Sequence, residues 1–123
     1  MTLALHHLAL GARDVENIAR FYSESFGLPE LSRHVHESGA LRSIWLDLGG
    51  AILMVERTTE PLRHVELGAG PFLLAFSIGV NERVSLETRL EARGLRIESR
   101  TACTSYFRDP EGNRVAISHY PEQ

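Results

Sequence analysis

The side chains with the greatest capacity for chemistry in this sequence are six histidines and one cysteine. His34 and His36 are two residues apart, so on a strand they would share one face, a spacing that could bind zinc with a third ligand. No third ligand is suggested by the sequence, and we expect both to be solvated on an outer strand. His6 and His7 are adjacent, so strand alternation predicts that they point to opposite faces.

Nucleophilic catalysis finds little support in the spacing of polar residues. Cys103 is the one cysteine, which excludes an internal disulfide, and we expect it to be a small buried strand residue. The sequence contains no Ser-His-Asp or Cys-His arrangement typical of nucleophilic catalysis. Gly49-Gly50 is predicted to be a hairpin turn rather than a phosphate-binding loop, because no helix follows it. His7 is the acid–base candidate with a plausible position, since imidazole titrates near neutral pH.

The elements that must position these residues occur twice along the chain. In the first half, the apolar pattern predicts a strand over Leu3 to Leu10, and the capping residues predict a helix from Asp14 to Gly27. The apolar residues of this helix fall on one face: Val15, Ile18, Ala19, Tyr22 and Phe26. Three strands should follow, over Leu31 to Glu37, Leu41 to Leu48 and Ala51 to Glu56.

The second half repeats this order with a small drift. Phe72 to Val80 is strand-like, Asn81 can cap a helix carrying Val84, Leu86 and Leu90, and strands are predicted over Arg96 to Arg100, Ala102 to Arg108 and Arg114 to His119. Aligning His7 with Leu73 gives an offset of 66 (73 minus 7), and aligning Gly27 with Gly94 gives 67 (94 minus 27). We therefore predict one α+β domain of residues 1–123, with modules over 1–57 and 72–123 and a linker over 58–71.

Composition excludes several classes of partner. The chain has 43% apolar and 24% charged residues, a net charge of −3 and no lysine, so it offers no broad cationic face for nucleic acid. Its longest apolar run is far below the roughly 20 residues of a membrane helix, and the N-terminus lacks a signal pattern. We expect a cytoplasmic protein with no membrane or nucleic-acid partner.

Four stretches together resemble the vicinal oxygen chelate superfamily of glyoxalases, bleomycin resistance proteins and dioxygenases. They are His7-Leu8-Ala9-Leu10 with Asp14, Phe21-Tyr22 with Phe26-Gly27-Leu28, Leu74-Ala75-Phe76-Ser77-Ile78, and Asp109-Pro110-Glu111-Gly112-Asn113 leading into Val115-Ala116-Ile117. The resemblance covers essentially the whole chain. It implies two βαβββ modules whose curved mixed sheet encloses a cleft, commonly completed in a homodimer.

The same resemblance implies where a divalent metal would be bound, and the sequence departs from it. His7 matches the first-strand ligand, but Leu73 stands where the second histidine belongs. Ala116 stands at the usual glutamate position, and the fourth-strand position falls on Leu53 or Met54. Because a bound cation needs three or more converging donors, we expect no metal and no other cofactor at this site.

Strand alternation and the resemblance together predict the lining of a small-molecule pocket. The candidate ligand-binding residues are His7, Ala9, Trp45, Leu53, Leu73, Thr104, Tyr106, Arg108, Arg114 and Ala116. Such a lining is mainly apolar and favours an aromatic or amphipathic molecule. Asp47 would suit a cationic ligand, whereas Arg108 and Arg114 would suit a carboxylate or phosphate. Alternatively, each of these charged residues is a solvated residue at a strand end. Trp45 and Tyr106 could equally be ordinary core residues.

Three functions remain open from the sequence. The first is a metal-free small-molecule-binding protein of the bleomycin-resistance type, a homodimer that sequesters or senses its ligand. The second is a metal-dependent lyase, isomerase or thiol transferase with non-standard ligands, so whether the chain is an enzyme stays open. The third is an interaction domain whose cleft is filled by its own side chains. The sequence also leaves open the ligand's identity and whether the modules are exchanged between chains.

Overall fold

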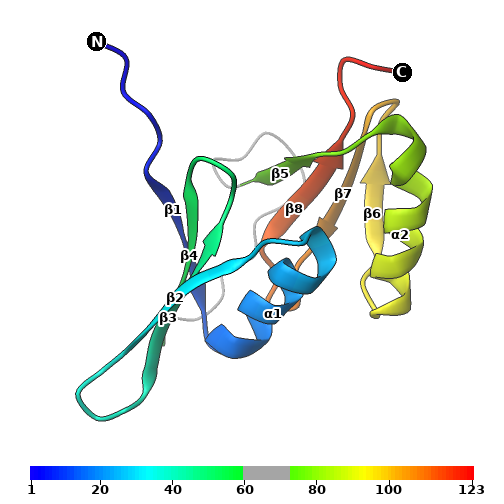
Figure 1. Cartoon of the computed structure of the whole chain (residues 1–123). Helices are drawn as coiled ribbons and strands as arrows, with labels where there is room; N and C mark the ends of the chain where they lie inside the picture. The colour runs from blue at the N-terminus through cyan, green and yellow to red at the C-terminus, as the bar shows by residue number, and fades with distance from the viewer. Residues whose placement is uncertain (60–72) are drawn as a thin grey trace. The chain divides into compact units, whose positions relative to one another are not determined.

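Each half of the chain folds into one four-stranded mixed sheet and a helix, as the computed structural model shows (Figure 1). The structure describes residues 1–59 and 73–123, and the chain divides into a first unit, Met1–Pro61, and a second unit, Leu62–Gln123. The predicted α+β class with two βαβββ modules is confirmed, with one sheet in each unit over the described residues. The predicted linker lies outside the described residues except for Thr58 and Thr59, and the exact module boundaries stay a prediction.

The first unit has the strand order β1-β4-β3-β2. β1 pairs in parallel with β4, and the other two pairings are antiparallel. Its elements are β1 (His7–Ala12), α1 (Val15–Phe26), β2 (Glu30–Val35), β3 (Leu41–Asp47) and β4 (Ile52–Arg57). The strand–helix–three-strand order matches the sequence expectation, with strand ends shifted by a few residues.

Helix α1 begins and ends where its sequence signals predict. The Asp14 side chain accepts a hydrogen bond from the backbone N–H of Asn17 at 3.0 Å, which satisfies one of the free donors of the first turn. Gly27 adopts the left-handed conformation, with φ of 68°, that ends many helices. Between them Ile18 and Tyr22 are fully buried, so the apolar stripe packs on the sheet as predicted.

Strand β1 begins at His7 rather than at Leu3. Its ladder with β4 runs from His7 opposite Ile52 to Ala12 opposite Arg57. Strand β4 starts at Ile52, directly after the β3–β4 turn, so it cannot pair with residues before His7. The last bond at this end of the ladder joins the N–H of Ile52 to the carbonyl of His6. Apolar composition alone therefore overestimates the length of β1, because a strand extends only as far as its neighbouring strand can pair with it.

The second unit repeats the topology with the order β5-β8-β7-β6, in which β5 and β8 are parallel. Its elements are β5 (Leu74–Ser77), the 3₁₀ helix η1 (Val80–Glu82), α2 (Arg83–Ala92), β6 (Ile97–Arg100), β7 (Thr104–Arg108) and β8 (Arg114–Ser118). Gly94, with φ of 87°, follows the helix as Gly27 follows α1. The internal repeat predicted from the sequence is thus present in both units.

The predicted cap of the second helix is wrong. Asn81 lies within η1 and does not cap α2, whose N-cap is Glu82 without a side-chain hydrogen bond. The helix carries Val84, Leu86 and Leu90 as predicted; Leu86 and Leu90 are buried, and Val84 is 76% exposed. The stripe that faces the protein also carries the charged residues Arg83 and Glu87, so apolar periodicity describes only part of it.

In each unit one sheet face packs towards the helix, and we call the opposite one the open face, although Ala116 and Arg114 on that face of the second unit are buried. Strand alternation and the ladder registers assign every side chain to one of the two. The helix side holds the core, which includes Ile44, Leu46, Leu53 and Val55 in the first unit and Phe107, Val115 and Ile117 in the second. The open faces hold most of the predicted site residues.

Candidate functional site

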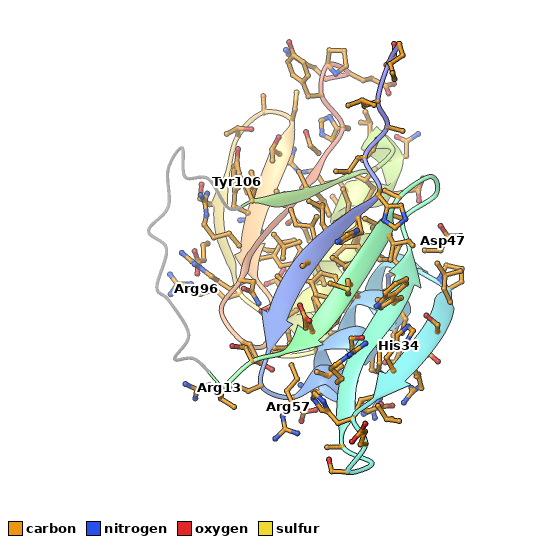
Figure 2. The ribbon with its side chains drawn as sticks, turned by 90° about the vertical axis from the view of Figure 1, so that its left-hand side faces the viewer. Arg13, His34, Asp47, Arg57, Arg96 and Tyr106 are labelled. Carbon is orange, nitrogen blue, oxygen red and sulfur yellow. The ribbon has the colours of Figure 1, made fainter. Side chains whose placement is uncertain are left out.

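The open face of the first unit carries an aromatic and aliphatic surface. The ladders place Ala9, Met54 and Trp45 in one row across β1, β4 and β3, and His7 lies one step along β1 on the same face. In Figure 2 the strands of this unit lie in front of α1, so the open face is turned to the viewer, with His34 and Asp47 labelled. The predicted positions of His7, Ala9 and Trp45 on one face follow from this register.

Trp45 and His34 form the most specific contact of this face. Their ring centroids are 4.7 Å apart with planes inclined by 46°, and His34 Nε2 lies 3.0 Å from the hydroxyl of Ser32. The indole N–H of Trp45 is buried and has no hydrogen-bond acceptor among the described residues. His34 is therefore part of the aromatic surface, a role that the sequence did not suggest because the β2–β3 pairing could not be read from it.

Leu53 does not belong to the open face. It lies opposite Leu46 on β3 and Leu8 on β1, is 1% exposed, and forms part of the helix-side core. Met54 takes its place beside Trp45. The sequence allowed either Leu53 or Met54 at the fourth-strand position. Neighbouring side chains of a strand point to opposite faces, and the observed register places Met54 on the same face as Trp45.

His6 and His7 contact each other rather than diverging. Their Nδ1 atoms are 2.8 Å apart and their rings meet edge to face, with centroids 5.1 Å apart. Strand alternation does not govern this pair because His6 precedes β1. A hydrogen bond between two imidazole nitrogens requires one of them to carry the proton, so the pair holds at least one proton between these atoms.

The open face of the second unit carries the remaining candidates. Ala75, Ala116 and Tyr106 form one row across β5, β8 and β7, and the guanidinium carbon of Arg114 lies 5.8 Å from the Tyr106 ring centroid. The neighbouring row contains Thr104, whose hydroxyl lies 2.8 Å from that of Ser118. Ser118 lies on this face, as strand alternation predicts.

Arg108 and Leu73 lie at the margins of this face. The Arg108 side chain donates to Glu98 at 3.3 Å and to the carbonyl of Gly112 at 3.0 Å, so these two acceptors already occupy part of its guanidinium. Leu73 immediately precedes β5 and is 42% exposed. Neither residue extends the aromatic row, and the use of Arg108 as an anion clamp stays a prediction.

Equivalent positions in the two units hold related side chains. Trp45 lies opposite Met54 on β4 in the same way as Tyr106 lies opposite Ala116 on β8. Each open face therefore has an aromatic ring at the same place in its topology. One step away the charges differ, because Asp47 in the first unit corresponds to Arg108 in the second.

The side chains at the positions implied by the family resemblance do not fit a divalent cation. His7 offers one nitrogen, while Met54, Leu73 and Ala116 offer no oxygen or nitrogen donor. Among residues 1–59 and 73–123, no three His, Cys, Asp or Glu side chains are grouped closely enough to hold a metal ion. A single imidazole surrounded by hydrocarbon would not replace the water that a cation gives up.

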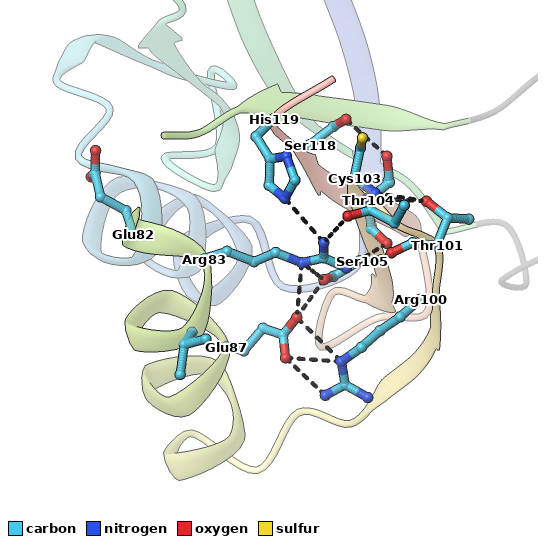
Figure 3. Close-up of polar contacts among 12 residues, drawn as sticks. Glu82, Arg83, Glu87, Arg100, Thr101, Cys103, Thr104, Ser105, Ser118 and His119 are labelled. Carbon is cyan, nitrogen blue, oxygen red and sulfur yellow. Dashed lines mark hydrogen bonds and ion pairs between the residues drawn. The ribbon is translucent and has the colours of Figure 1, made fainter. Parts of the chain in front are cut away.

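A second polar cluster lies on the helix side of the second unit and was not predicted. Glu87 of α2 accepts hydrogen bonds from Arg100 Nη2 at 2.8 Å and from the hydroxyl of Ser105, and it pairs with Arg83 at 3.5 Å (Figure 3). Burial opposes ionisation, but the hydrogen bonds from Arg100 and Ser105 and the charges of both arginines outweigh it and lower the pKa of Glu87. The carboxylate is therefore ionised at neutral pH.

A shallow hollow also occurs beside α1, on the other side of the first sheet from Trp45. It has a volume of about 110 Å³ and is lined by Glu16, Ala19, Arg20, Ser23, Glu30, Arg33 and Leu46. Arg33 binds Glu16 at 2.6 Å and Glu30 at 2.9 Å, and its hydrogen bond lowers the pKa of Glu16. These pairs are half exposed and already satisfy one another, so the hollow is a weaker candidate than the open faces.

Comparison with known proteins places the chain in a family. The model of the Glyoxalase/Bleomycin resistance protein/Dioxygenase superfamily matches residues 4–117. No curated protein matches the chain in sequence. In the part of the chain that the structure describes, no helix is long and apolar enough to cross a membrane.

Several solved structures share the fold at low sequence identity. The E126Q mutant of the fosfomycin resistance protein FosX from Listeria monocytogenes, complexed with Mn(II) and 1S,2S-dihydroxypropylphosphonic acid, has a TM-score of 0.82 at 17% identity and covers 97% of this chain and 94% of its own. A possible glyoxalase from Bacillus cereus has a TM-score of 0.73 at 22% identity, covering 95% and 99%. Lactoylglutathione lyase from Agrobacterium tumefaciens has a TM-score of 0.68 at 23% identity, covering 94% and 92%. With a family model that matches nearly its whole length, the chain belongs to the Glyoxalase/Bleomycin resistance protein/Dioxygenase superfamily.

Proposed function

We propose that this chain is a small-molecule-binding member of its superfamily that works without a metal ion. The observation that carries the proposal is the chemistry of its open faces, where Trp45 and Tyr106 occupy equivalent positions and hydrocarbon occupies three positions at which the resemblance implies metal ligands. Aromatic and aliphatic side chains bind ligands by removing apolar area from water, at roughly 25 cal/mol per Å². The ligand class that suits them is aromatic or amphipathic.

The polar groups on these faces give such a ligand an orientation. The buried indole N–H of Trp45 needs an acceptor, and the hydroxyl pair of Thr104 and Ser118 can both donate and accept. Arg114 beside Tyr106 adds a positive charge, whereas Asp47 adds a negative one at the margin of the other face. Each face taken by itself suits an amphipathic ligand with one hydrogen-bonding end. The physiological role that we propose is sequestration or sensing of such a ligand in a cytoplasmic homodimer.

Metal analysis tests the first half of the proposal. The purified protein is analysed for metal content and titrated with zinc, nickel and manganese, alongside His7→Ala and the control His36→Ala. We expect less than stoichiometric metal and no difference between the variants. Stoichiometric metal that is lost in His7→Ala alone would support a metal-dependent enzyme instead and overturn the proposal.

Ligand binding tests the second half, and the sequence supplies its own reporter. Trp45 is the single tryptophan of the chain, so its fluorescence reports directly on the proposed surface. A library of aromatic and amphipathic compounds is screened by thermal shift, where a ligand at 100 times its Kd adds about 2.7 kcal/mol of stability. Hits on the open face of the first unit should quench Trp45 emission, and hits on the open face of the second unit should lose affinity in Tyr106→Ala but not in Tyr120→Ala, whose side chain is 79% exposed.

Light scattering on the same samples should give twice the mass of one chain. If hits bind without changing Trp45 emission, the open face of the first unit is not the binding surface. If no compound in a broad library raises Tm, an interaction domain without a ligand becomes the better description.

A further inference from the structure

Arg83 uses every hydrogen-bond donor that a guanidinium has. A guanidinium carries five N–H groups and has no acceptor. The first residue of α2 directs all five at separate acceptors at 2.9 to 3.1 Å: the hydroxyl of Ser105, the carbonyls of Thr101, Ala102 and Thr104, and Nε2 of His119 (Figure 3). The side chain is 13% exposed, so water cannot readily substitute for a lost partner.

This arrangement fixes the proton on His119. Because Arg83 can only donate, His119 Nε2 must accept with a free lone pair. The other ring nitrogen, Nδ1, bonds the backbone carbonyl of Glu122, which can only accept, so Nδ1 must carry the hydrogen. His119 is therefore neutral and in the Nδ1–H tautomer whenever both bonds are made.

His119 also attaches the C-terminal residues to the β6–β7 turn. Its backbone N–H donates to the carbonyl of Cys103 at 2.9 Å, and its carbonyl accepts from the N–H of Glu122 at 2.8 Å. The thiol of Cys103 lies 3.7 Å from the carbonyl of Glu122. His119 itself is only 8% exposed, so one buried ring joins α2, the turn and the end of the chain.

We propose that His119 is a proton-sensitive latch that holds the C-terminal segment, residues 119–123, on the second unit. A proton on Nε2 removes the acceptor for Arg83 and sets an imidazolium against a guanidinium at 3.1 Å. Both the lost acceptor and the repulsion break the hydrogen bond between Arg83 and His119 and favour release of the C-terminal segment. Acid therefore opens the latch, and neutral pH closes it. This regulation goes beyond the proposed ligand binding and does not depend on it.

The charged surroundings of His119 favour this direction. On α2, Arg83 is the charged group in contact with the ring, and Glu87 is already neutralised by Arg100 of β6 and by Arg83 itself. From the turn Cys103 presents its thiol, and from the C-terminal segment Glu122 presents its backbone carbonyl. Among these groups none supplies a free carboxylate that would stabilise an imidazolium.

The tautomer is tested first, on the unmodified protein. Long-range ¹H–¹⁵N correlation spectra at pH 7.5 should show a protonated Nδ1 and an unprotonated Nε2 for His119. Acidification from roughly pH 7.5 to 5 should then lower the amide-exchange protection of Glu122 and His119 about tenfold. Amides of β3 and β4 in the first unit serve as internal references.

Two variants separate titration from general destabilisation. His119→Gln keeps an acceptor without a titrating group, so its C-terminal protection should stay constant over this pH range. His36→Gln removes an exposed histidine outside the cluster and should behave as the unmodified protein does. A protonated Nε2 at pH 7.5, or equal pH dependence of C-terminal protection in the unmodified protein and His119→Gln, would overturn the latch. The first of these readouts needs no variant to fold.

Discussion

Replacing Glu87 by alanine removes a carboxylate that contacts three side chains at once. Glu87 is 8% exposed and binds Ser105, Arg100 and Arg83. After the change Ser105, which is fully buried, loses the acceptor for its hydroxyl hydrogen, and Arg83 loses its nearest negative charge. Arg100 is 52% exposed and can turn to solvent, so its loss contributes little.

The expected loss follows from the two buried partners. An unsatisfied buried hydroxyl costs about 1–2 kcal/mol. Removing the counter-charge of Arg83 costs about 2 kcal/mol more, which is below the usual loss for a broken buried pair because Arg83 keeps its five hydrogen bonds. Alanine recovers roughly 0.4 kcal/mol of helix propensity. We expect Glu87→Ala to lower the free energy of unfolding by about 3 kcal/mol and Tm by roughly 10 °C.

Chemical denaturation with urea at pH 7 measures this loss. Glu91→Ala is the matched control, because it makes the same substitution in the same helix at an exposed position, and it should change stability by less than about 0.5 kcal/mol. Glu87→Gln, which retains an acceptor, should fall between the two. Equal stability of Glu87→Ala and Glu91→Ala would refute the reasoning, since it would mean that the cluster contributes nothing to the folded state.

Other perturbations have defined outcomes. Because the pKa of Glu87 is lowered in the folded state, its ionised carboxylate stabilises the fold above the ordinary carboxyl pKa of about 4.3. This stabilisation is lost as pH falls through the lower pKa of the folded state. Urea midpoints measured between pH 6 and 3 should therefore fall more steeply for the unmodified protein than for Glu87→Gln. Asp109→Ala should cost about 2–3 kcal/mol, because its buried carboxylate accepts from the N–H groups of Glu111 and Asn113, and a loss below 1 kcal/mol in urea would contradict this. Asp14→Ala should cost about 1 kcal/mol through the lost cap, with Asp14→Asn close to the unmodified protein by the same assay. Gly27→Ala should lower stability by about 1 kcal/mol, measured by Tm, because φ of 68° strains any residue with a Cβ atom.

The fold was predictable where local signals and periodicity agree. The cap at Asp14, the left-handed Gly27 and the apolar stripe through Ile18 and Tyr22 define α1 from the sequence alone. The repeat of the same order 66 to 67 residues later made the two-module architecture readable. Strand ends were less predictable because they depend on the partner, as β1 shows by starting at His7 rather than Leu3.

The site was predictable only as far as alternation holds. Alternation placed Trp45 and Tyr106 on the face opposite the helix, where the structure has them, and their role in binding stays a prediction. On the fourth strand the sequence allowed two phases, and Leu53 lies on the helix side. The Glu87 and His119 cluster was missed for a different reason. Its members lie on α2, β6, β7 and the C-terminal segment, and charged residues on a helix resemble a solvated face until tertiary pairing is known.

The self-contained ladders of the two units have a consequence for how the chain acquires its structure. All three strand pairings of each sheet come from one half of the sequence, and the longest separation within the first, between His7 and Ile52, is 45 residues (52 minus 7). The entropy lost on closing a loop grows only logarithmically with its length, so neither half must wait for the other to nucleate. Each strand ladder can thus close without a strand from the other half of the chain.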